Sequence, residues 1–388
     1  FSFLYRFFPI RFSHCRCVKV VCWIHQGTPQ CAVMQKGVVM SRKIGRKRKL
    51  LVFLGVLCVI IAMVFGLRSY NIHTYGSMSS DDAASLADPA TYNTTVEGVT
   101  VSRYDRTYVR GFHLVPTHRT KAGSVIVFGG SEGSSAFEDA AELARSGVEV
   151  YSLFFFGQDG QQSALREVPL EFIEEVLPDA PHPITVRGAS KGAELALNLA
   201  ARYPEIDNVI AVAPSAYSFN GLDSSSDRSP HSSWKWRGEP VPYVPFAADA
   251  TVMMRTIGGS LLGFPTSSRA MYDASLNKAS ESDRETARIK VENFKGNILL
   301  LAGEDDRMWD SAGAASIIAD HASRRPDGSG TVESFTYPGA GHALGGPRYI
   351  AGLDLGGNED ANKHAHQDSD EVIMRHIADW HEAQSVAQ

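Results

Sequence analysis

Residues 184–197, ITVRGASKGAELAL, constrain the fold more than any other stretch of this chain. A run of β-type residues leads into Gly188-Ala189-Ser190-Lys191-Gly192, and an Ala/Leu-rich helical pattern follows directly. A serine on a sharp turn between a strand and a helix is the setting of the G-x-S-x-G nucleophile elbow. Glycines suit the two flanking positions, because side chains there would crowd the strained backbone around the serine. The motif therefore predicts a nucleophilic Ser190, and the alternative is an ordinary Gly-rich strand-to-helix turn.

The chain after residue 96 alternates strand-like and helix-like segments on both sides of this motif. Besides the strand before Ser190, strands are predicted at residues 99–102, 107–116, 124–128, 148–156, 208–213, 297–302 and 331–337. Helices are predicted between most of them, and an amphipathic helix is predicted over residues 368–383. The first two strands look like an antiparallel pair. The repeated alternation that follows predicts an α/β fold with a mostly parallel, doubly wound sheet.

Residues 214–295 interrupt this alternation. They are polar at first and then rich in aromatic residues and proline. A long insertion in a compact domain is usually functional, so we interpret this segment as a cap over the site. Its aromatic residues are expected either to line a substrate pocket or to form the core of the cap: Trp234, Trp236, Tyr243 and Phe246.

The composition is that of a globular protein. Of 388 residues, 44% are hydrophobic and 21% are charged, which allows one large α/β domain with extra segments, or two domains. A formal net charge of −5 argues against a general nucleic-acid binder. All the cysteines precede residue 59, so the later sequence offers no disulfide, cysteine nucleophile or cysteine-ligated metal. His364 and His366 lie near Asp368 and Asp370, but two histidines in a polar loop are more often solvated, and we expect no metal.

The N-terminal part of the chain reads as a series of short segments before the domain. Residues 1–39 mix aromatic, basic and cysteine residues without periodicity, and we interpret them as a non-native or unusual leader before a start at Met40. Residues 40–49 are basic. Residues 50–67 are uncharged and as a helix would span about 27 Å, close to the thickness of the bilayer core. Residues 68–95 are rich in Ser, Asp, Ala and Thr, which predicts a flexible linker.

The charges around residues 50–67 predict the orientation of this apolar helix. Basic residues cluster before it and only Arg68 follows closely, so the positive-inside rule places the basic segment in the cytoplasm. We therefore expect a single-pass signal anchor, with a hydrolase-like domain over residues 96–388 on the extracytoplasmic side. The alternative is a cleaved signal peptide, whose apolar core is usually shorter and ends at a small-residue site.

Candidates for the base and the acid that a serine nucleophile needs follow Ser190 in the chain. With a nucleophile elbow of this type, the acid comes first and the histidine second. Asp306 follows the predicted strand at 297–302, with its neighbour Asp305 as the alternative acid. His342 follows the last predicted strand in a Gly-flanked loop. Both would lie at the carboxyl ends of parallel strands, where such sheets place their sites.

An oxyanion hole is predicted from two backbone N–H groups. One is that of Lys191, directly after the nucleophile, and the other comes from the loop after the strand at 124–128. Gly130 and Ser131 fit this second place, because a Gly-rich loop lets main-chain donors approach a developing negative charge. The alternative is a phosphate-binding turn, but the loop has neither a G-x-G-x-x-G nor a P-loop lysine pattern.

Four segments resemble one known family: residues 188–195, Arg237-Gly238-Glu239-Pro240, Gly303-Glu304-Asp305-Asp306 with Trp309, and Gly341-His342. In this order they are similar to the C-terminal catalytic domain of the acyl-CoA thioesterase and bile acid-CoA:amino acid N-acyltransferase family. The resemblance covers roughly residues 96–385 and implies an α/β-hydrolase fold. In that family the nucleophile is serine in thioesterases and cysteine in the conjugating enzymes, so Ser190 implies hydrolysis. Animal members carry an immunoglobulin-like domain before the hydrolase, where we expect only a linker here.

These features together predict a membrane-anchored serine hydrolase. It would cleave acyl thioesters or esters through an acyl-enzyme on Ser190, with the membrane and a small acyl substrate as partners and with no cofactor or nucleic acid. Coenzyme A esters are not expected outside the cytoplasm. A carboxylesterase or acyltransferase acting on lipid or exogenous esters is therefore a second interpretation. The third is a catalytically silent hydrolase fold that serves as a binding module.

Overall fold

The computed structural model describes residues 19–25, 28–34, 46–76, 85–223, 229–247 and 249–383. The chain divides into two units, Phe1–Ala62 and Met63–Gln388. In the first unit, β1 (Lys19–His25) and β2 (Thr28–Met34) form an antiparallel hairpin. The sequence pattern predicted no strand here, although both segments contain the β-branched residues that favour extended structure. The rest of the expected leader lies outside the described residues.

The helix α1 (Arg46–Tyr75) contains the expected membrane anchor. Within Arg48–Tyr75, a window of 18 residues has a mean hydropathy of 3.1. No other helix among the described residues is long and apolar enough to cross a membrane. The helix extends well beyond residue 67, where the anchor was expected to end. The first part of the expected linker is therefore helical. Tyr70 and Ile72 continue the apolar character of the helix past Arg68.

The end of the expected linker is also ordered. Residues 85–95 include a short 3₁₀ helix, η1 (Pro89–Thr91), whose first turn is capped by Asp88. Tyr92 then stacks on Phe137 and Phe154, with ring centroids 5.3 and 6.0 Å apart. This aromatic contact fixes the segment to the domain, so the flexible linker predicted over residues 68–95 is too long.

Eight strands form the central sheet of the second unit, in the order β13-β12-β9-β8-β5-β6-β4-β3. Their bounds are β3 Val99–Arg103, β4 Arg110–Pro116, β5 Ser124–Phe128, β6 Glu149–Phe154, β8 Ile184–Ala189, β9 Asn208–Val212, β12 Asn297–Gly303 and β13 Val332–Tyr337. Neighbours from β13 to β6 pair in parallel, whereas β4 pairs antiparallel with β6 and β3. The topology confirms the predicted α/β-hydrolase fold class.

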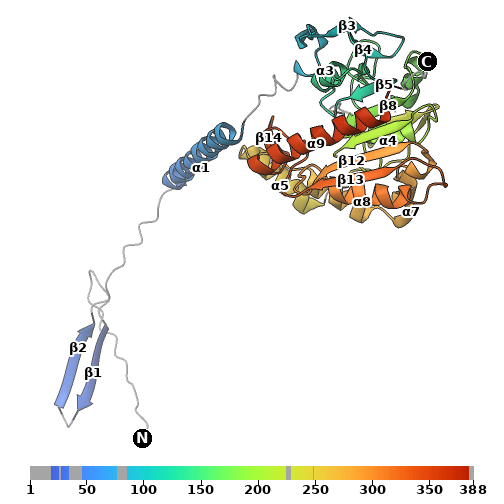
Figure 1. Cartoon of the computed structure of the whole chain (residues 1–388). Coiled ribbons are helices and arrows are strands. Elements are labelled where there is room, and N and C mark those ends of the chain that lie inside the picture. Colours follow the sequence, from blue (N-terminus) through green and yellow to red (C-terminus); the bar gives the residue numbers. More distant parts are fainter. Residues whose placement is uncertain are drawn as a thin grey trace, which may run out of the picture. The chain divides into compact units, whose positions relative to one another are not determined.

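Helices cover both faces of this sheet (Figure 1). One face carries α4 (Lys191–Ala200) and α8 (Ser311–Ala322), and the other carries α3 (Phe137–Arg145) and α9 (Glu359–Trp380). Successive side chains of β5 point to opposite faces, as in any strand. Ile126 joins the core with α4, and Val127 joins the core with α3. This alternation explains why the central strands are continuous apolar runs in the sequence.

The helix α9 is longer than the helix predicted at residues 368–383. It begins at Glu359 because the Asn358 side chain accepts a hydrogen bond from the N–H of Ala361 at 3.0 Å and caps the helix. The early turns are polar, so the sequence has no apolar stripe there that would predict a helix. His364 and His366 therefore lie on a helix and not in a polar loop.

The insertion predicted at residues 214–295 leaves the sheet after β9 and returns to it at β12. It contains the short strands β10 (Trp234–Trp236) and β11 (Glu239–Pro240), the helices α5 (Ala250–Leu261), α6 (Arg269–Lys278) and α7 (Glu281–Ala287), and the 3₁₀ helix η3 (Val291–Asn293). β10 also pairs with β7 (Val168–Pro169), which precedes η2 (Leu170–Glu175). A hairpin of β14 (Tyr349–Ile350) and β15 (Leu353–Asp354) lies between β13 and α9.

Candidate active site

Ser190 occupies a tight turn between β8 and α4. Its backbone has φ 57° and ψ −121°, a strained conformation for a residue with a side chain. A Cβ atom on Gly188 would lie 2.0 Å from the carbonyl oxygen of Gly192, and one on Gly192 would lie 2.0 Å from that of Gly129. Both glycines of the motif are thus required by close backbone contacts. The turn has the strand–turn–helix geometry expected for the predicted nucleophile elbow.

The elbow serine forms a hydrogen-bonded chain with His342 and Asp306. His342 Nε2 lies 2.8 Å from Ser190 Oγ, and His342 Nδ1 lies 2.8 Å from Asp306 Oδ2. The three residues follow β8, β12 and β13, so the carboxyl ends of three parallel strands bring them together. Asp306 and His342 are 1% and 7% exposed, respectively, which shields the pair from water. The arrangement has the geometry of the relay of nucleophile, base and carboxylate that acyl transfer to serine requires.

We call the loop after β12, residues 304–309, the acid loop. Its two adjacent carboxylates, Asp305 and Asp306, have different contacts. Asp306 Oδ1 accepts hydrogen bonds from the N–H groups of Met308 and Trp309, at 2.8 and 3.2 Å, which leaves Oδ2 for His342. Asp305 instead pairs with Arg307 at 2.9 Å and accepts the N–H of Gly357 at 3.0 Å. The geometry therefore places Asp306, and not Asp305, against the histidine.

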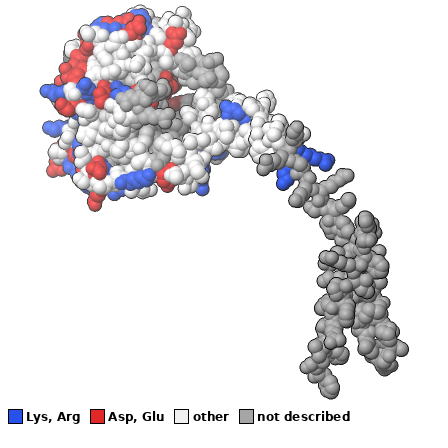
Figure 2. Space-filling view, turned by 180° about the vertical axis from the view of Figure 1, so that it is seen from behind, with Lys and Arg blue, Asp and Glu red and all other residues white. Residues whose placement is uncertain are grey.

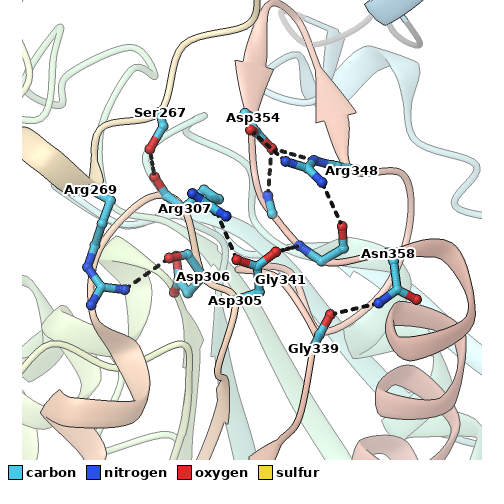
Figure 3. A network of polar contacts seen from close by, with 12 residues as sticks. Ser267, Arg269, Asp305, Asp306, Arg307, Gly339, Gly341, Arg348, Asp354 and Asn358 are labelled. Atoms are coloured by element: carbon cyan, nitrogen blue, oxygen red, sulfur yellow. Dashed lines mark hydrogen bonds and ion pairs between the residues drawn. The ribbon is translucent and has the colours of Figure 1, made fainter.

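The insertion also supports the acid loop (Figure 3). Arg269, the first residue of α6, donates from Nη1 to the carbonyl oxygen of Asp306 at 3.1 Å. Ser267 Oγ donates to the carbonyl oxygen of Arg307 at 2.5 Å. On the histidine side, the Asn362 side chain of α9 accepts the N–H of Gly341 at 2.9 Å. The sequence did not identify Arg269 or Asn362, because both are ordinary polar residues far from the motifs they hold.

Trp309 connects the acid loop to the core of the insertion. Its ring meets the His342 ring edge-on, with centroids 4.6 Å apart, and its Nε1 donates to the carbonyl oxygen of Pro214 at 3.0 Å. On its other side it contacts Tyr272 of α6 at 5.2 Å. The two aromatic residues help to line an apolar cavity of about 90 Å³, together with Phe219, Leu276 and Ile317. The histidine is thus held from the side by an indole that belongs to the core of the insertion.

The predicted oxyanion loop lies directly beside Ser190. A Cβ atom on Gly130 would lie 3.2 Å from Cβ of Ser190. The N–H of Gly130, however, donates to Oε1 of Glu132 at 2.8 Å, and that oxygen also accepts the hydroxyl of Ser134 at 2.6 Å. Of the two candidates in this loop, Ser131 therefore has the N–H that is not engaged by Glu132. The sequence did not reveal the role of Glu132, because a side chain that folds back onto its own loop leaves no pattern.

Lys191 contributes more than its predicted backbone N–H. Its ammonium group is fully buried and donates to Glu194 Oε2 at 2.8 Å and to Ser233 Oγ at 2.9 Å. Glu194 Oε1 in turn accepts Trp234 Nε1 at 2.7 Å and the N–H of Phe219 at 3.1 Å. Burial lowers the pKa of Lys191, and the Glu194 carboxylate beside it opposes that shift. This buried network joins the elbow helix to the insertion.

The four aromatic residues expected to line a substrate pocket or to form the core of the cap have different surroundings. Trp234 is 0% exposed and belongs to the core under α4, so it has no surface to offer a substrate. Trp236 packs on Tyr203, with ring centroids 5.4 Å apart. Phe246 contacts Tyr272 at 5.0 Å and forms part of the core of the insertion. The half-buried Tyr243 is not in that core cluster. The alternative that these residues build the insertion fits Trp234 and Phe246 better.

His364 and His366 of α9 lie near acidic residues that could suggest a metal site. His366 Nδ1 lies 3.2 Å from Asp370 Oδ2, one turn further along the helix. Among the residues that the structure describes, no three His, Cys, Asp or Glu side chains converge as a metal site would need. The contact is an i,i+4 helix pair at the surface.

Several known proteins are similar to this chain. Residues 169–350 match the model of the BAAT / acyl-CoA thioester hydrolase C-terminal family. The chain is 24% identical over 292 residues to acyl-coenzyme A amino acid N-acyltransferase 1 of Mus musculus, covering 69% of this chain and 63% of that protein. It is 24% identical over 247 residues to the mouse peroxisomal succinyl-coenzyme A thioesterase, covering 61% and 52%. The chain thus spans less than two thirds of the length of these relatives.

Among solved structures, a hyperthermophilic esterase from the archaeon Pyrobaculum calidifontis is similar. It has a TM-score of 0.44 and 14% sequence identity, covering 84% of this chain and 98% of that one. The predicted family resemblance is confirmed by the family match, which includes the elbow, the acid loop and His342.

Proposed function

We propose, on the premise that residues 169–350 match the BAAT / acyl-CoA thioester hydrolase C-terminal family, that the chain is a serine hydrolase that cleaves acyl thioesters or esters. The observation that carries the proposal is the chain of 2.8 Å contacts from Asp306 through His342 to Ser190. A buried carboxylate, an imidazole and a strained serine in this order have the geometry of acyl transfer. A silent binding module has no need of this alignment.

In the proposed reaction, His342 takes the proton of Ser190 as Oγ attacks the acyl carbonyl carbon. The new C–O bond gives a tetrahedral oxyanion, and its collapse breaks the bond to the thiolate or alkoxide, which receives the proton from Nε2. Water then attacks the acyl-enzyme with the same histidine as base, and the acid is released. Asp306 keeps the Nδ1–H tautomer in place and stabilises the imidazolium that forms in each half-reaction.

The oxyanion is stabilised by two backbone N–H groups in this proposal. Lys191 supplies one from the first turn of α4, where amide groups have no acceptor within the helix. Ser131 supplies the other, because the N–H of Gly130 is held by Glu132. Removing a single donor of such a hole costs about 3–4 kcal/mol of transition-state stabilisation in other enzymes.

We propose hydrolysis in preference to transfer to an amino acid. The named relatives include both an N-acyltransferase and a thioesterase, and the serine at position 190 favours the second activity. If glycine is added to the enzyme and substrate, the free acid should remain the product. Formation of an acyl-glycine amide at the expense of the acid would contradict this choice.

A second candidate function is supported by α1. We propose that this helix spans a membrane and that the basic residues at its start hold that end in the cytoplasm. The catalytic domain would then lie outside the cytoplasm, where lipid esters or exogenous esters are the available substrates. The insertion at residues 214–295 would serve as the cap of the site in either case.

A fluorophosphonate probe tests the proposed chemistry on the full chain in detergent. The wild-type chain is expected to label, Ser190→Ala is expected not to label, and the surface variant Ser282→Ala serves as the matched control. Labelling that persists in Ser190→Ala would remove the basis of the proposal. Hydrolysis of acyl-coenzyme A, p-nitrophenyl esters and phospholipids then ranks the substrate classes, and protease treatment of intact cells reports the side of the membrane.

A further inference from the structure

The helix α5 of the insertion has an unusual exposure. None of its residues, all of which the structure describes, is buried. Three large apolar side chains recur along one stripe at spacings of four residues: Met253, Ile257 and Leu261, which are 52, 60 and 61% exposed. Met254 beside them is 72% exposed, and Phe264 just after the helix is 40% exposed. Together they form a continuous apolar surface, which we call the α5 patch.

Such a helix is not stable by itself in water. Its Asp249 cap accepts the N–H groups of Thr251 and Val252, but a cap contributes only about 1 kcal/mol. Isolated helices of this length are marginal, and helices in proteins are held mainly by burying an apolar face. Contiguous exposed apolar surface of this kind marks a binding surface for a protein or a membrane. The α5 patch therefore requires a covering partner.

The contacts at the end of α5 identify this partner. Arg68 of α1 donates from Nη1 to the carbonyl oxygens of Ser260 and Leu261, at 2.5 and 3.3 Å. Asn71, which is only 2% exposed, donates to the carbonyl oxygen of Leu262 at 2.9 Å. A Cβ atom on Gly263 would lie 2.7 Å from the carbonyl oxygen of Arg68. The C-terminal end of α5 thus contacts α1 just past its uncharged stretch.

This position has a direct meaning if α1 spans a bilayer. Arg68 is the first charged residue after residues 50–67, and basic residues at the end of a membrane helix lie at the lipid–water interface. The end of α5 is then at the interface too. Arg255 is the only charged residue within Ala250–Leu261, and the Asp249 carboxylate before the first turn accepts two backbone N–H groups of the helix. Figure 2 shows mixed acidic and basic side chains along one side of the domain.

We propose that α5 is an interfacial helix that inserts the α5 patch into the outer surface of the bilayer where α1 emerges. Helices that lie in this plane bury an apolar face about 5–10 Å into the boundary between headgroups and acyl chains. The occupant of the patch is the lipid surface, because the patch is continuous with the helix that crosses it. This inference rests on α1 as a membrane span and is independent of the chemistry at Ser190.

The docking of α5 also has a consequence for the active site. The segment after α5 binds the acid loop: Ser268 Oγ donates to the carbonyl oxygen of Met308 at 2.7 Å, and Arg269 N–H donates to that of Arg307 at 3.0 Å. Only a few residues separate the α5 patch from this contact. A docked α5 would hold the loop that carries Asp306 near the membrane, where substrates with a long acyl chain reside.

The test places a fluorescent probe on α5 in the full chain. A variant without its native cysteines receives one cysteine at Met254→Cys or Ile257→Cys, which is labelled with a nitrobenzoxadiazole maleimide. The protein is reconstituted into phosphatidylcholine vesicles with and without doxyl-labelled lipid. Matched controls are Thr256→Cys, away from the stripe on the same helix, and Ser282→Cys on the exposed helix α7. Two positions within the patch guard against a local effect of one label.

Labels at positions 254 and 257 are expected to have a blue-shifted emission. Doxyl lipid should quench them at least threefold more than the label at position 282, and the quenching at position 256 should be intermediate. Aqueous iodide should quench in the reverse order. Equal iodide quenching at all four positions would mean that water covers the patch, and would overturn the inference. A third outcome is that the labels are shielded from iodide but are not quenched by doxyl lipid. If this shielding rises with the density of protein in the vesicle, a second copy of the chain covers the patch. That outcome would overturn it as well.

Discussion

His342 Nε2 lies 2.8 Å from Ser190 Oγ, although the two residues are 152 positions apart in the sequence. The contact exists because β8 and β13 run in the same direction and deliver both loops to one edge of the sheet. Four elements hold it in place: the strained elbow, the acid loop, the indole of Trp309 and the N-terminal turn of α9. The elbow and the acid loop each make a measurable prediction.

The assignment of the acid predicts different outcomes for two neighbouring substitutions. Asp306→Asn should lower kcat roughly 10³- to 10⁴-fold, because an amide cannot hold the Nδ1–H tautomer of His342 or stabilise the imidazolium. Asp305→Asn should lower kcat much less, since it breaks only the contacts to Arg307 and Gly357. Steady-state hydrolysis of a p-nitrophenyl ester measures both. A larger loss for Asp305→Asn would transfer the role to that residue.

The close contact at the elbow predicts that Gly192→Ala inactivates the enzyme. The added Cβ would lie 2.0 Å from the carbonyl oxygen of Gly129, so the loop that supplies the second oxyanion donor must move. Overpacking of this kind typically costs about 1–3 kcal/mol of stability. Gly258→Ala on α5 is the matched control, because its Cβ meets nothing within 4 Å and alanine favours a helix. Equal activity and melting temperature in the two variants would refute this view of the turn.

The buried pair of Lys191 and Glu194 predicts strong coupling. Lys191→Met leaves the buried Glu194 carboxylate without its cation and should destabilise the fold by about 3–5 kcal/mol. Adding Glu194→Gln should recover part of that loss. The exposed pair of Lys290 and Glu285 gives the comparison, and Lys290→Met should cost no more than about 1 kcal/mol. Thermal unfolding in detergent compares the three variants with the wild type, and equal shifts for both lysines would argue against a structural role of the buried network.

The surface cluster at α7 predicts a small acid-sensitive term in stability. Hydrogen bonds from Arg288 and Lys290 lower the pKa of Glu285 to about 2, compared with about 4.3 in an unfolded chain. Because the folded-state pKa is the lower one, the stabilisation is complete above about pH 4.5 and is lost as the pH falls toward 2. The melting temperatures of the wild type and Glu285→Gln should therefore differ near pH 6 and converge near pH 2. The difference should be small, since the Glu285 side chain is 56% exposed. A gap that widens in acid would contradict the sign.

The sequence predicted the parts of the site that a local pattern encodes. The elbow, the acid loop and His342 each follow an apolar strand, and their order along the chain identified Ser190, Asp306 and His342 as partners. It favoured Asp306 and left Asp305 as the alternative, because the two differ only in how the loop turns after β12. That turn is set by the N–H groups of Met308 and Trp309.

The remaining features depend on contacts between distant segments. Trp234 was expected either to line a substrate pocket or to form the core of the cap, and its indole N–H binds Glu194 in the core, which no spacing reveals. Glu132 takes the N–H of Gly130 by folding back on its own loop. The predicted linker is too long for the same reason: Tyr92 packs on Phe137 across the domain, and Arg68 finds its acceptors on α5. Composition alone described both ends of that segment as flexible.

An acyl-enzyme on Ser190 is the central claim, and its direct observation is the strongest test. The full chain in detergent is mixed rapidly with a p-nitrophenyl ester, and the release of p-nitrophenol is followed before steady state. The acylated protein is then quenched in acid, digested and analysed by mass spectrometry. The account predicts a burst of about one p-nitrophenol per active site and an acyl group on the peptide that contains Ser190, with neither in His342→Gln. An acyl group on another residue, or turnover without any acylated peptide, would contradict it.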